Sequence, residues 1–503
     1  MLRRPPEKTI NRKQMNTRLL CAMTLAPLTL IACSDSSDRP STPPAVACSG
    51  TAVTPERLFL QQVGSDRAII KWRGNTDGGA EADAVCFGTE MDFLDEDSLT
   101  AAEVTATGHS EALLQGLTPD TTYYYSVGGA GSAQAQHSFR TAPEAGQLPA
   151  DGNIRLWIVG DSGVNSQENE YQGGADLVRD GYLAWVNENG GEPADLFLML
   201  GDNAYPEGTD VQHQIAVFDT YPDILSSTGL WPTIGNHEMG FFGASTSSDP
   251  DSFSAPQGGE PDPAPDSPMP YLNIHTLPTN GEAGGVGSGT EQYYSFDYGS
   301  VHVVSLDSQL AVRDPASREA MLQWVTDDLA ANTSDWTVVI FHHPPYTKGS
   351  HDSDKILGGI DQPIFDMREQ FTPVFDEYGV DLVYSGHSHI YERSFYIGGH
   401  TGLAATFDPA TNAELNDAGQ PASGQGDEEY TQVTRNGTDD KVVYTVAGNG
   451  GKATDVADSF PHPAHFFGGL VIGSVVVDAA ESSLTARFID DNGEVLDSFT
   501  INR

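Results

Sequence analysis

The chain has 503 residues, of which 71 are acidic and 25 are basic, so its formal net charge at pH 7 is -46. So acidic a surface makes nucleic acid and anionic membranes implausible electrostatic partners. Hydrophobic residues make up 38% of the chain, which is enough for ordinary cores, and the length indicates at least two domains.

Residues 1–33 have the pattern of an export signal. Basic residues precede an apolar run at 19–32, which is too short to span a bilayer as a mature helix and is typical of a signal-peptide core. The sequence LIAC at 30–33 resembles a bacterial lipobox. It predicts cleavage before Cys33 and a lipid anchor on that cysteine, which would hold the protein on a membrane facing the periplasm or the cell exterior, with residues 34–48 as a linker. Plain secretion is the alternative, and Met15 is a second candidate start.

Residues 49–145 predict a small all-β sandwich. Apolar and polar residues alternate between closely spaced turn signals, as in AIIKW at 68–72 and LTPDTTYYYSV at 117–127. The second run resembles a fibronectin type III module. No catalytic residue types cluster here, so we expect a scaffold, joined by a linker at 143–149 to the remainder of the chain. An exported compartment permits a disulfide between Cys48 and Cys86, but the sequence does not show that they are close.

From residue 150 onward, five short apolar runs end in glycine or in polar residues. Such runs indicate buried strands, and helical patterns at 317–331 and 363–378 lie between them, so we expect an α/β fold with its site at the carboxyl ends of the strands. The predicted strands are Ile154–Val159, Asp195–Leu200, Leu230–Ile234, Trp336–Phe341 and Asp381–Ser385.

The residues that follow these strands are of metal-ligand types. Their oxygen and nitrogen donors suit iron, zinc or manganese, and they outnumber the ligands of one tetrahedral ion, so we predict two metals that share a bridging group. Taken singly, Asp161 and Asn236 are as well explained as turn residues, and His342 as a buried core histidine. If His387 and His389 lie in a strand, both imidazoles point to one face, which an apolar core would not need. The candidate ligands are Asp161, Asp202, Tyr205, Asn236, His342, His387 and His389.

The motifs GDSG, GDNAY, GNHE, VIFH and GHSH, in this order, resemble the five-block signature of the calcineurin-like metallophosphoesterases. The tyrosine of the second motif is similar to that of the purple acid phosphatases, whose plant-type members also carry an amino-terminal domain of the fibronectin type. The resemblance covers residues 150–503. It implies a four-layer α-β-β-α catalytic domain that includes a carboxy-terminal β region at 440–503.

The same resemblance implies a ligand set and an activity. Asp161, Tyr205 and His389 would hold Fe³⁺, Asn236, His342 and His387 would hold Zn²⁺, Fe²⁺ or Mn²⁺, and Asp202 would bridge the two ions. The implied activity is hydrolysis of small phosphate esters, of the acid phosphatase type, by a metal-bound hydroxide. A phosphodiesterase or nucleotidase of the same superfamily, or a non-catalytic surface binding protein, are the alternatives.

Further residues receive roles by the same comparison. His237 matches a histidine that contacts the substrate, and His351 matches one that protonates the leaving group, although Asp352 stands where the family often has a second histidine. We expect His343, next to a ligand, to point to the opposite face and to be structural. Because the substrates are anions and the chain is acidic, Lys348 and Arg393 are expected to help the metals create a local positive field.

Overall fold

The computed structural model describes most of the chain after residue 47. The described residues are Cys48, Ala82 and the ranges 53–75, 84–99, 108–130, 137–164, 173–239, 269–355, 361–432 and 441–503. The predicted export signal, the lipobox at Cys33 and nearly all of the predicted linker lie outside them. Within the described ranges, no helix combines the length and the apolar character that a membrane span requires.

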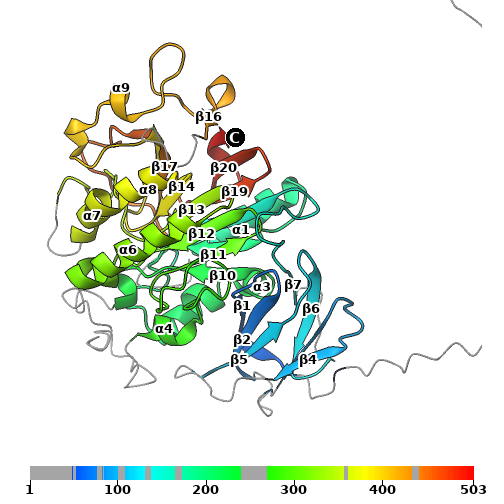
Figure 1. The fold of residues 1–503 in the computed structure, drawn as a ribbon. Coiled ribbons are helices and arrows are strands. Elements are labelled where there is room, and N and C mark those ends of the chain that lie inside the picture. The colour runs from blue at the N-terminus through cyan, green and yellow to red at the C-terminus, as the bar shows by residue number, and fades with distance from the viewer. Residues whose placement is uncertain are drawn as a thin grey trace, which may run out of the picture. The chain divides into compact units, whose positions relative to one another are not determined.

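The largest sheet has ten strands, in the order β16-β21-β20-β19-β8-β9-β10-β1-β2-β5 (Figure 1). Its three central strands β8, β9 and β10 run parallel, so their carboxyl ends meet at one edge. The strands are β1 (Pro55–Gln61), β2 (Arg67–Asn75), β5 (His109–Gln115), β8 (Ile154–Val159), β9 (Leu196–Met199), β10 (Gly229–Pro232), β16 (Tyr430–Thr431), β19 (Gly473–Ala479), β20 (Ser483–Asp490) and β21 (Val495–Asn502).

A second sheet has seven strands, in the order β11-β12-β13-β14-β17-β15-β18. Here β12, β13, β14 and β17 run parallel. The strands are β11 (Tyr294–Tyr298), β12 (Val301–Ser305), β13 (Trp336–Ile340), β14 (Leu382–Ser385), β15 (Tyr391–Ile397), β17 (Val442–Ala447) and β18 (His465–Gly469). The five strands predicted from apolar runs are thus confirmed as β8, β9, β10, β13 and β14, each within two residues at either end.

One hydrophobic core is shared by the two sheets. Leu198 and Trp231 of the first sheet belong to the same buried cluster as Val338 and Tyr384 of the second. Successive side chains of a strand point to opposite faces. The side chains on the outer faces of these strands therefore pack in other buried clusters, which also contain helix residues. Val339 of β13, for example, packs with residues of the helix at 315–331.

The longest described helix, α6 (Pro315–Ala331), is capped at its amino end by Asp314, whose carboxylate accepts a hydrogen bond from the backbone N–H of Ser317. The remaining α-helices are α1 (Ala175–Glu188), α2 (Asp210–His213), α3 (Pro222–Leu225), α4 (Pro270–Ile274), α5 (Leu310–Arg313), α7 (Gln362–Asp366), α8 (Thr372–Tyr378) and α9 (Pro409–Asn412). The helix predicted at 363–378 is present, but a π-helical turn, η5 (Met367–Phe371), separates α7 from α8. Pro373 explains this interruption, because it has no N–H to donate into the preceding turn and its ring crowds that turn.

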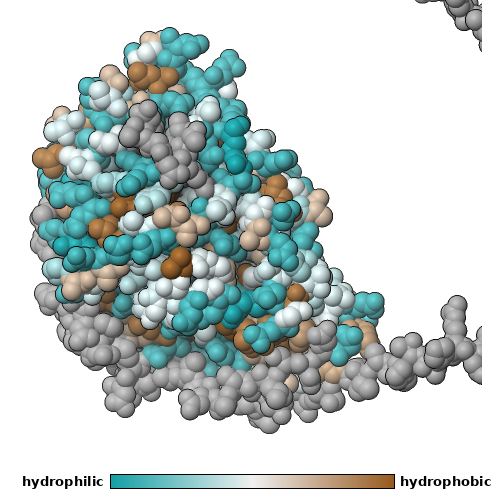
Figure 2. All heavy atoms as spheres, viewed as in Figure 1, coloured by the Kyte–Doolittle hydropathy of each residue, from teal (hydrophilic) through white to brown (hydrophobic). Residues whose placement is uncertain are grey.

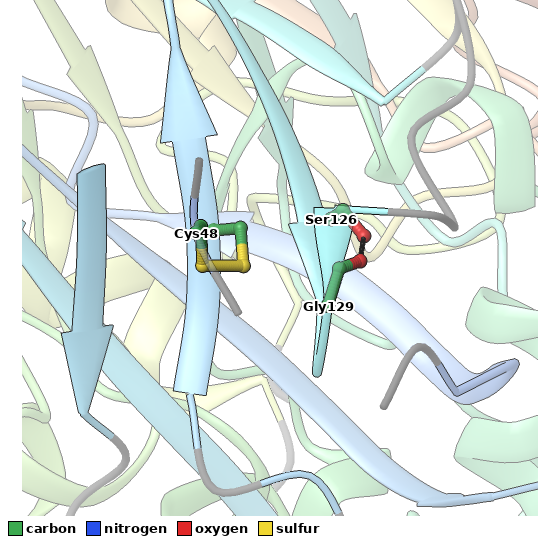
Figure 3. Close-up of a disulfide and its surroundings, with 4 residues drawn as sticks. Cys48, Ser126 and Gly129 are labelled. Atoms are coloured by element: carbon green, nitrogen blue, oxygen red, sulfur yellow. Dashed lines mark hydrogen bonds between the residues drawn. A yellow bond between two sulfur atoms is a disulfide. The ribbon is translucent and has the colours of Figure 1, made fainter. Parts of the chain in front are cut away.

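The amino-terminal region contains a separate four-stranded sheet as well as β1, β2 and β5. This sheet has the order β4-β3-β6-β7, with β3 (Ala84–Gly88), β4 (Glu96–Leu99), β6 (Thr122–Val127) and β7 (Ser138–Arg140). A single buried cluster that includes Trp72 of β2 and Tyr125 of β6 fills the space between the two groups of strands. Cys48 is joined by a disulfide to Cys86 in β3 (Figure 3), a pairing that the sequence left open.

The amino-terminal strands are not a free-standing sandwich. β1 pairs in parallel with β10, with Leu60 opposite Gly229, so the ten-stranded sheet runs from one region into the other. Both faces of β1 are buried for this reason. Phe59 packs in a cluster with strands and helices of the carboxy-terminal region, and Leu60 packs in the amino-terminal cluster.

Candidate metal centre

The seven candidate ligands lie where the parallel strands end. Asp161 follows β8, Asp202 follows β9, and His387 follows β14. These three residues have positive φ angles of 53°, 52° and 64°, a conformation that residues other than glycine rarely adopt and that is concentrated at functional sites. The chain must turn this sharply because the strand ends meet closely. A Cβ at Gly386 would clash with the carboxylate of Asp161.

Three donor groups form the first cluster. The hydroxyl of Tyr205 lies 3.1 Å from Asp161 Oδ1 and 3.0 Å from His389 Nε2. The distance from His389 Nε2 to Asp161 Oδ1 is 3.4 Å. A carboxylate, a phenol and an imidazole therefore point at one small volume.

Three other donor groups form the second cluster. Asn236 Oδ1 lies 3.1 Å from His342 Nε2 and 2.9 Å from His387 Nδ1. All three side chains are neutral ligand types, and His342 and His387 are buried. This set carries less negative charge than the first, so the two clusters suit cations of different charge.

Asp202 lies between the two clusters. Its Oδ2 is 3.1 Å from the Tyr205 hydroxyl and 3.3 Å from His342 Nε2. Metal–ligand bonds of about 2.0–2.2 Å place adjacent donor atoms of one ion roughly 3 Å apart. The spacing of these side chains therefore fits two metal ions with a carboxylate between them. The assignment of each residue to one ion stays a prediction.

Groups outside the two clusters fix the orientation of the ligands. His342 Nδ1 donates to the carbonyl of Leu200 at 2.9 Å, which leaves the lone pair of its Nε2 toward Asn236. The carboxylate of Glu238 accepts hydrogen bonds from the backbone N–H groups of Asp202 and Gly235, at 3.0 and 2.7 Å. Burial and then the charge of Asp202 raise the pKa of Glu238 to about 7. Glu238 thus ties the loops after β9 and β10 together.

His387 and His389 do not share one face of a strand, so that prediction is wrong. Both residues lie in bends after the end of β14, not in a strand. His387 has a positive φ, and its Nδ1 faces Asn236, whereas His389 Nε2 faces Tyr205. The two imidazoles reach different clusters because the backbone bends here and His387 has a positive φ.

The two histidines predicted to contact substrate lie beside the clusters and are partly accessible. His237, with 18% of its side chain exposed, packs its ring against Tyr205 at a centroid distance of 4.3 Å. Its Nδ1 lies 2.6 Å from the carbonyl of Pro206. His351, with 26% exposed, stacks on the ring of His387 at 3.8 Å.

His343 does not point away from the centre as expected. Its buried ring lies 4.4 Å from that of His387 and 4.9 Å from that of His342. Its Nδ1 lies 2.9 Å from the hydroxyl oxygen of Ser308. His343 therefore packs directly against two candidate ligands.

The expected contribution of Lys348 and Arg393 to a positive field is also wrong. Lys348 Nζ is paired with carboxylates of Asp352 and, at 2.9 Å, Asp354. Arg393 donates to both carboxylate oxygens of Asp497, at 2.6 and 2.9 Å, and neither side chain is exposed. Both cations are balanced by acidic groups, so neither adds net positive charge at the centre.

Asp361 and Glu238 also lie at the centre, although no role was predicted for either residue from the sequence. Asp361 is buried, and its Oδ1 lies 2.7 Å from His351 Nδ1 and 3.2 Å from His387 Nε2. No local pattern marks Asp361, because it stands alone before a short helix. The GNHE motif was the available signal for Glu238, which directly follows His237.

Comparison with known proteins gives matches for both regions. Residues 154–391 match the family model of the calcineurin-like phosphoesterases, and residues 55–141 match that of the purple acid phosphatase N-terminal domain. Similar curated proteins include purple acid phosphatase 22 of Arabidopsis thaliana, with 30% identity over 55% of this chain and 51% of that protein. Purple acid phosphatase 1 of Ipomoea batatas has 28% identity over 56% of this chain and 50% of that protein. The chain thus spans about half the length of these two relatives.

Among solved structures, a purple acid phosphatase from yellow lupin (Lupinus luteus) seeds has the same fold. It aligns with a TM-score of 0.65 and 19% identity, over 90% of this chain and 75% of that one. The match and the fold together identify residues 154–391 as a calcineurin-like phosphoesterase domain. Both regions of the chain are similar to purple acid phosphatases, because the amino-terminal region matches the domain named for these proteins and the similar relatives carry the same name.

Proposed function

We propose that the protein hydrolyses small phosphate esters at this centre, as an acid phosphatase-type hydrolase. The observation that carries the proposal is the position of Asp202 Oδ2, 3.1 Å from Tyr205 in one ligand cluster and 3.3 Å from His342 in the other. When bound, two adjacent cations would offset the charge of a phosphate ester and lower the pKa of a water molecule. The donor set suits that arrangement and exceeds the needs of a structural ion.

The proposed metals are Fe³⁺ and a divalent ion, Zn²⁺, Fe²⁺ or Mn²⁺. The ferric site would be formed by Asp161, Tyr205 and His389, since a carboxylate and a phenolate are hard anionic donors. Burial, followed by the charges of Asp161 and Asp202, raises the pKa of Tyr205 well above its usual value. A phenolate at this position therefore needs a strongly charged cation.

His237 would contact the phosphoryl group of the substrate, and His351 would protonate its leaving group. The Nδ1 of His237 is held by the carbonyl of Pro206, and its Nε2 lies 3.8 Å from Asp202 Oδ2. A donor at this place stabilises the negative charge on the phosphoryl oxygens in the transition state. His351 is held through Nδ1 by Asp361, so Nε2 is the nitrogen left to give a proton to the departing alkoxide.

The test compares a chromogenic aryl phosphate with its bis-ester, using purified protein loaded with different metals. We expect metal-dependent turnover of the monoester. Faster turnover of the bis-ester identifies a phosphodiesterase instead. No turnover of either by fully metal-loaded protein contradicts the proposal and favours a surface binding protein.

We further propose that the protein is exported and anchored to a membrane by lipid at Cys33. The lipobox at 30–33 supports this proposal. Cys33→Ser should move the protein from the membrane fraction to the soluble or unprocessed pool. A mature, unmodified chain that begins well beyond Cys33 would contradict it.

We also propose a fibronectin type III-like sandwich for the amino-terminal region and a four-layer α-β-β-α arrangement for the carboxy-terminal one. Support comes from the buried cluster shared by β2 and β6, and from the larger one shared by the ten- and seven-stranded sheets. An experimental structure would test both assignments.

A further inference from the structure

A single carboxylate oxygen lies against two functional histidines that come from different loops. Asp361 Oδ1 is 2.7 Å from Nδ1 of His351 and 3.2 Å from Nε2 of His387. The Asp361 side chain has no exposed surface. The rings of the two histidines are stacked, with centroids 3.8 Å apart and planes inclined by 30°. The carboxylate and both rings therefore form one packed group.

This contact determines which nitrogen of His387 is free to bind a metal. A neutral imidazole carries one proton, and the nitrogen that faces a carboxylate keeps it. At His387 the nitrogen facing Asp361 is Nε2, so the lone pair lies on Nδ1, which is 2.9 Å from Asn236 Oδ1. Asp361 thus favours the tautomer that the second ligand cluster needs.

The same carboxylate orients His351. Its Nδ1 donates to Asp361, so Nε2 is the nitrogen that remains for the substrate. A buried carboxylate behind an imidazole holds the ring in place and stabilises its protonated form, as in the histidine–aspartate pairs of hydrolases. With 26% of its side chain exposed, His351 is accessible to a leaving group.

We propose that Asp361 is a positioning residue that orients the metal ligand His387 and the proton donor His351 through one oxygen atom. The proposal rests on the proposed phosphate ester hydrolysis for the role of His351. The orientation of His387 concerns metal binding alone and does not depend on that activity. Loss of the carboxylate should therefore weaken metal binding and also make kcat/KM more dependent on the leaving group. A merely structural residue would not change both properties together.

The test compares Asp361→Asn with Glu369→Gln. The asparagine keeps the size of the side chain but presents one acceptor oxygen in place of a carboxylate. Glu369 is exposed and lies in η5, directly after α7, so its replacement removes the same charge from the helical segment that follows Asp361. Circular dichroism and thermal unfolding establish that both variants are folded.

The first measurement is metal affinity, by competition with a chelator and elemental analysis. We expect Asp361→Asn to bind the more weakly held of two ions about 10- to 100-fold less tightly and to retain the other, while Glu369→Gln behaves as wild type. Unchanged affinity would overturn the role assigned to His387. A third bound ion in the wild type that is lost in Asp361→Asn would also overturn the proposal, since Asp361 would then be a ligand itself.

The second measurement is the dependence of kcat/KM on the leaving group. An alkyl phosphate needs protonation of its leaving alkoxide much more than a 4-nitrophenyl phosphate does, so Asp361→Asn should lose about tenfold more activity on the alkyl ester. Equal losses on both esters would overturn the role assigned to His351. If the wild type hydrolyses neither ester, the proposed function fails, and the metal affinities still decide whether Asp361 orients His387.

Asp361→Glu provides a second variant in case the asparagine variant does not fold. It retains the carboxylate but displaces it by one methylene group. Its metal affinity, and its ratio of kcat/KM for the aryl ester to kcat/KM for the alkyl ester, should therefore lie between those of wild type and Asp361→Asn. If both Asp361→Glu and Asp361→Asn have the metal affinity of wild type and its ratio of kcat/KM for the two esters, the proposal is wrong. An unfolded asparagine variant combined with wild-type values for the glutamate variant would contradict it as well.

Discussion

The guanidinium of Arg57 donates hydrogen bonds to both carboxylate oxygens of Asp210, at 2.6 and 2.9 Å. Arg57 belongs to β1 of the amino-terminal region, and Asp210 is the first residue of α2, shortly after the candidate ligand Tyr205. Arg73 adds a third hydrogen bond to the same carboxylate at 2.7 Å. A region without candidate catalytic residues therefore holds the segment that follows a candidate metal ligand.

Replacement of Arg57 by Met should destabilise the protein by about 2 kcal/mol, because it removes a buried cation and two hydrogen bonds from the buried carboxylate of Asp210 and leaves Arg73 as its counter-charge. The free energy of unfolding from urea titration measures the effect. Lys355→Gln is a suitable control, since Lys355 is 69% exposed in its pair with Asp352 and such surface pairs contribute little to stability. Equal effects of the two changes would show that the Arg57 pair does not stabilise the fold.

Asn236→Ala should reduce turnover of an aryl phosphate by orders of magnitude while the protein stays folded. The change removes a neutral oxygen donor beside His342 and His387 without leaving a buried charge, so the protein should bind the second metal less tightly. Metal content per chain, circular dichroism and kcat are measured on the same preparation. Full metal content with unchanged kcat would remove the basis for two metal ions.

Tyr205→Phe should abolish visible colour in iron-loaded protein. A phenolate bound to ferric iron absorbs visible light by charge transfer from the ligand to the metal, and phenylalanine keeps the ring but has no oxygen. The buried ring should still pack against His237, so the fold persists. An absorption spectrum of wild type and variant checks this expectation, and a colourless iron-loaded wild type would contradict the ferric site.

Stability should decrease in alkaline solution because of His302. Burial lowers the pKa of His302, but hydrogen bonds to Asp297 and Asp328, at 2.7 and 2.9 Å, raise it more, to about 9. The pKa in the folded state exceeds the unfolded value of 6.5, so this stabilisation is complete below pH 6.5 and is lost as the pH rises through about 9. Thermal unfolding between pH 6 and 10 should show a steeper loss in wild type than in His302→Gln. Parallel curves would exclude His302 as the cause.

The surface agrees with the composition of the chain. Figure 2 shows one face of the molecule on which hydrophilic residues predominate and hydrophobic residues are scattered. Such scattered apolar residues are ordinary on a soluble surface. The strongly negative charge makes the paired state of Lys348 and Arg393 significant, because under the proposed function the metals and histidines such as His237 would have to attract the anionic substrate.

Local patterns were sufficient to predict the strands and the seven candidate ligands. The run Ile154–Val159 is apolar on both faces, and the turn after it contains a glycine and Asp161, so both the buried strand and the site at its end could be predicted. The order of the five motifs along the chain indicated the other candidate ligands. The same local reasoning failed at His387, because a positive φ after a strand ends the alternation on which the argument depended.

Relationships between distant segments could not be predicted. The disulfide of Cys48 and Cys86 joins residues 38 positions apart, and Asp361 meets His387 from a loop with no motif of its own. Amphipathic periodicity describes one element at a time, so it could not show that β1 pairs with β10. Contacts of this kind depend on how the elements are assembled, which a single sequence does not reveal by its periodicity.

The parallel pairing of β1 with β10 has a consequence for any attempt to produce residues 150–503 alone. Without β1, the strand Gly229–Pro232 becomes the outer edge of its sheet, with unsatisfied backbone groups that invite pairing with another molecule. Phe218, which packs against Phe59 with ring centroids 5.1 Å apart, would at the same time be uncovered beside that edge. Residues 150–503 produced alone should therefore be prone to aggregation, because the amino-terminal region no longer covers this edge.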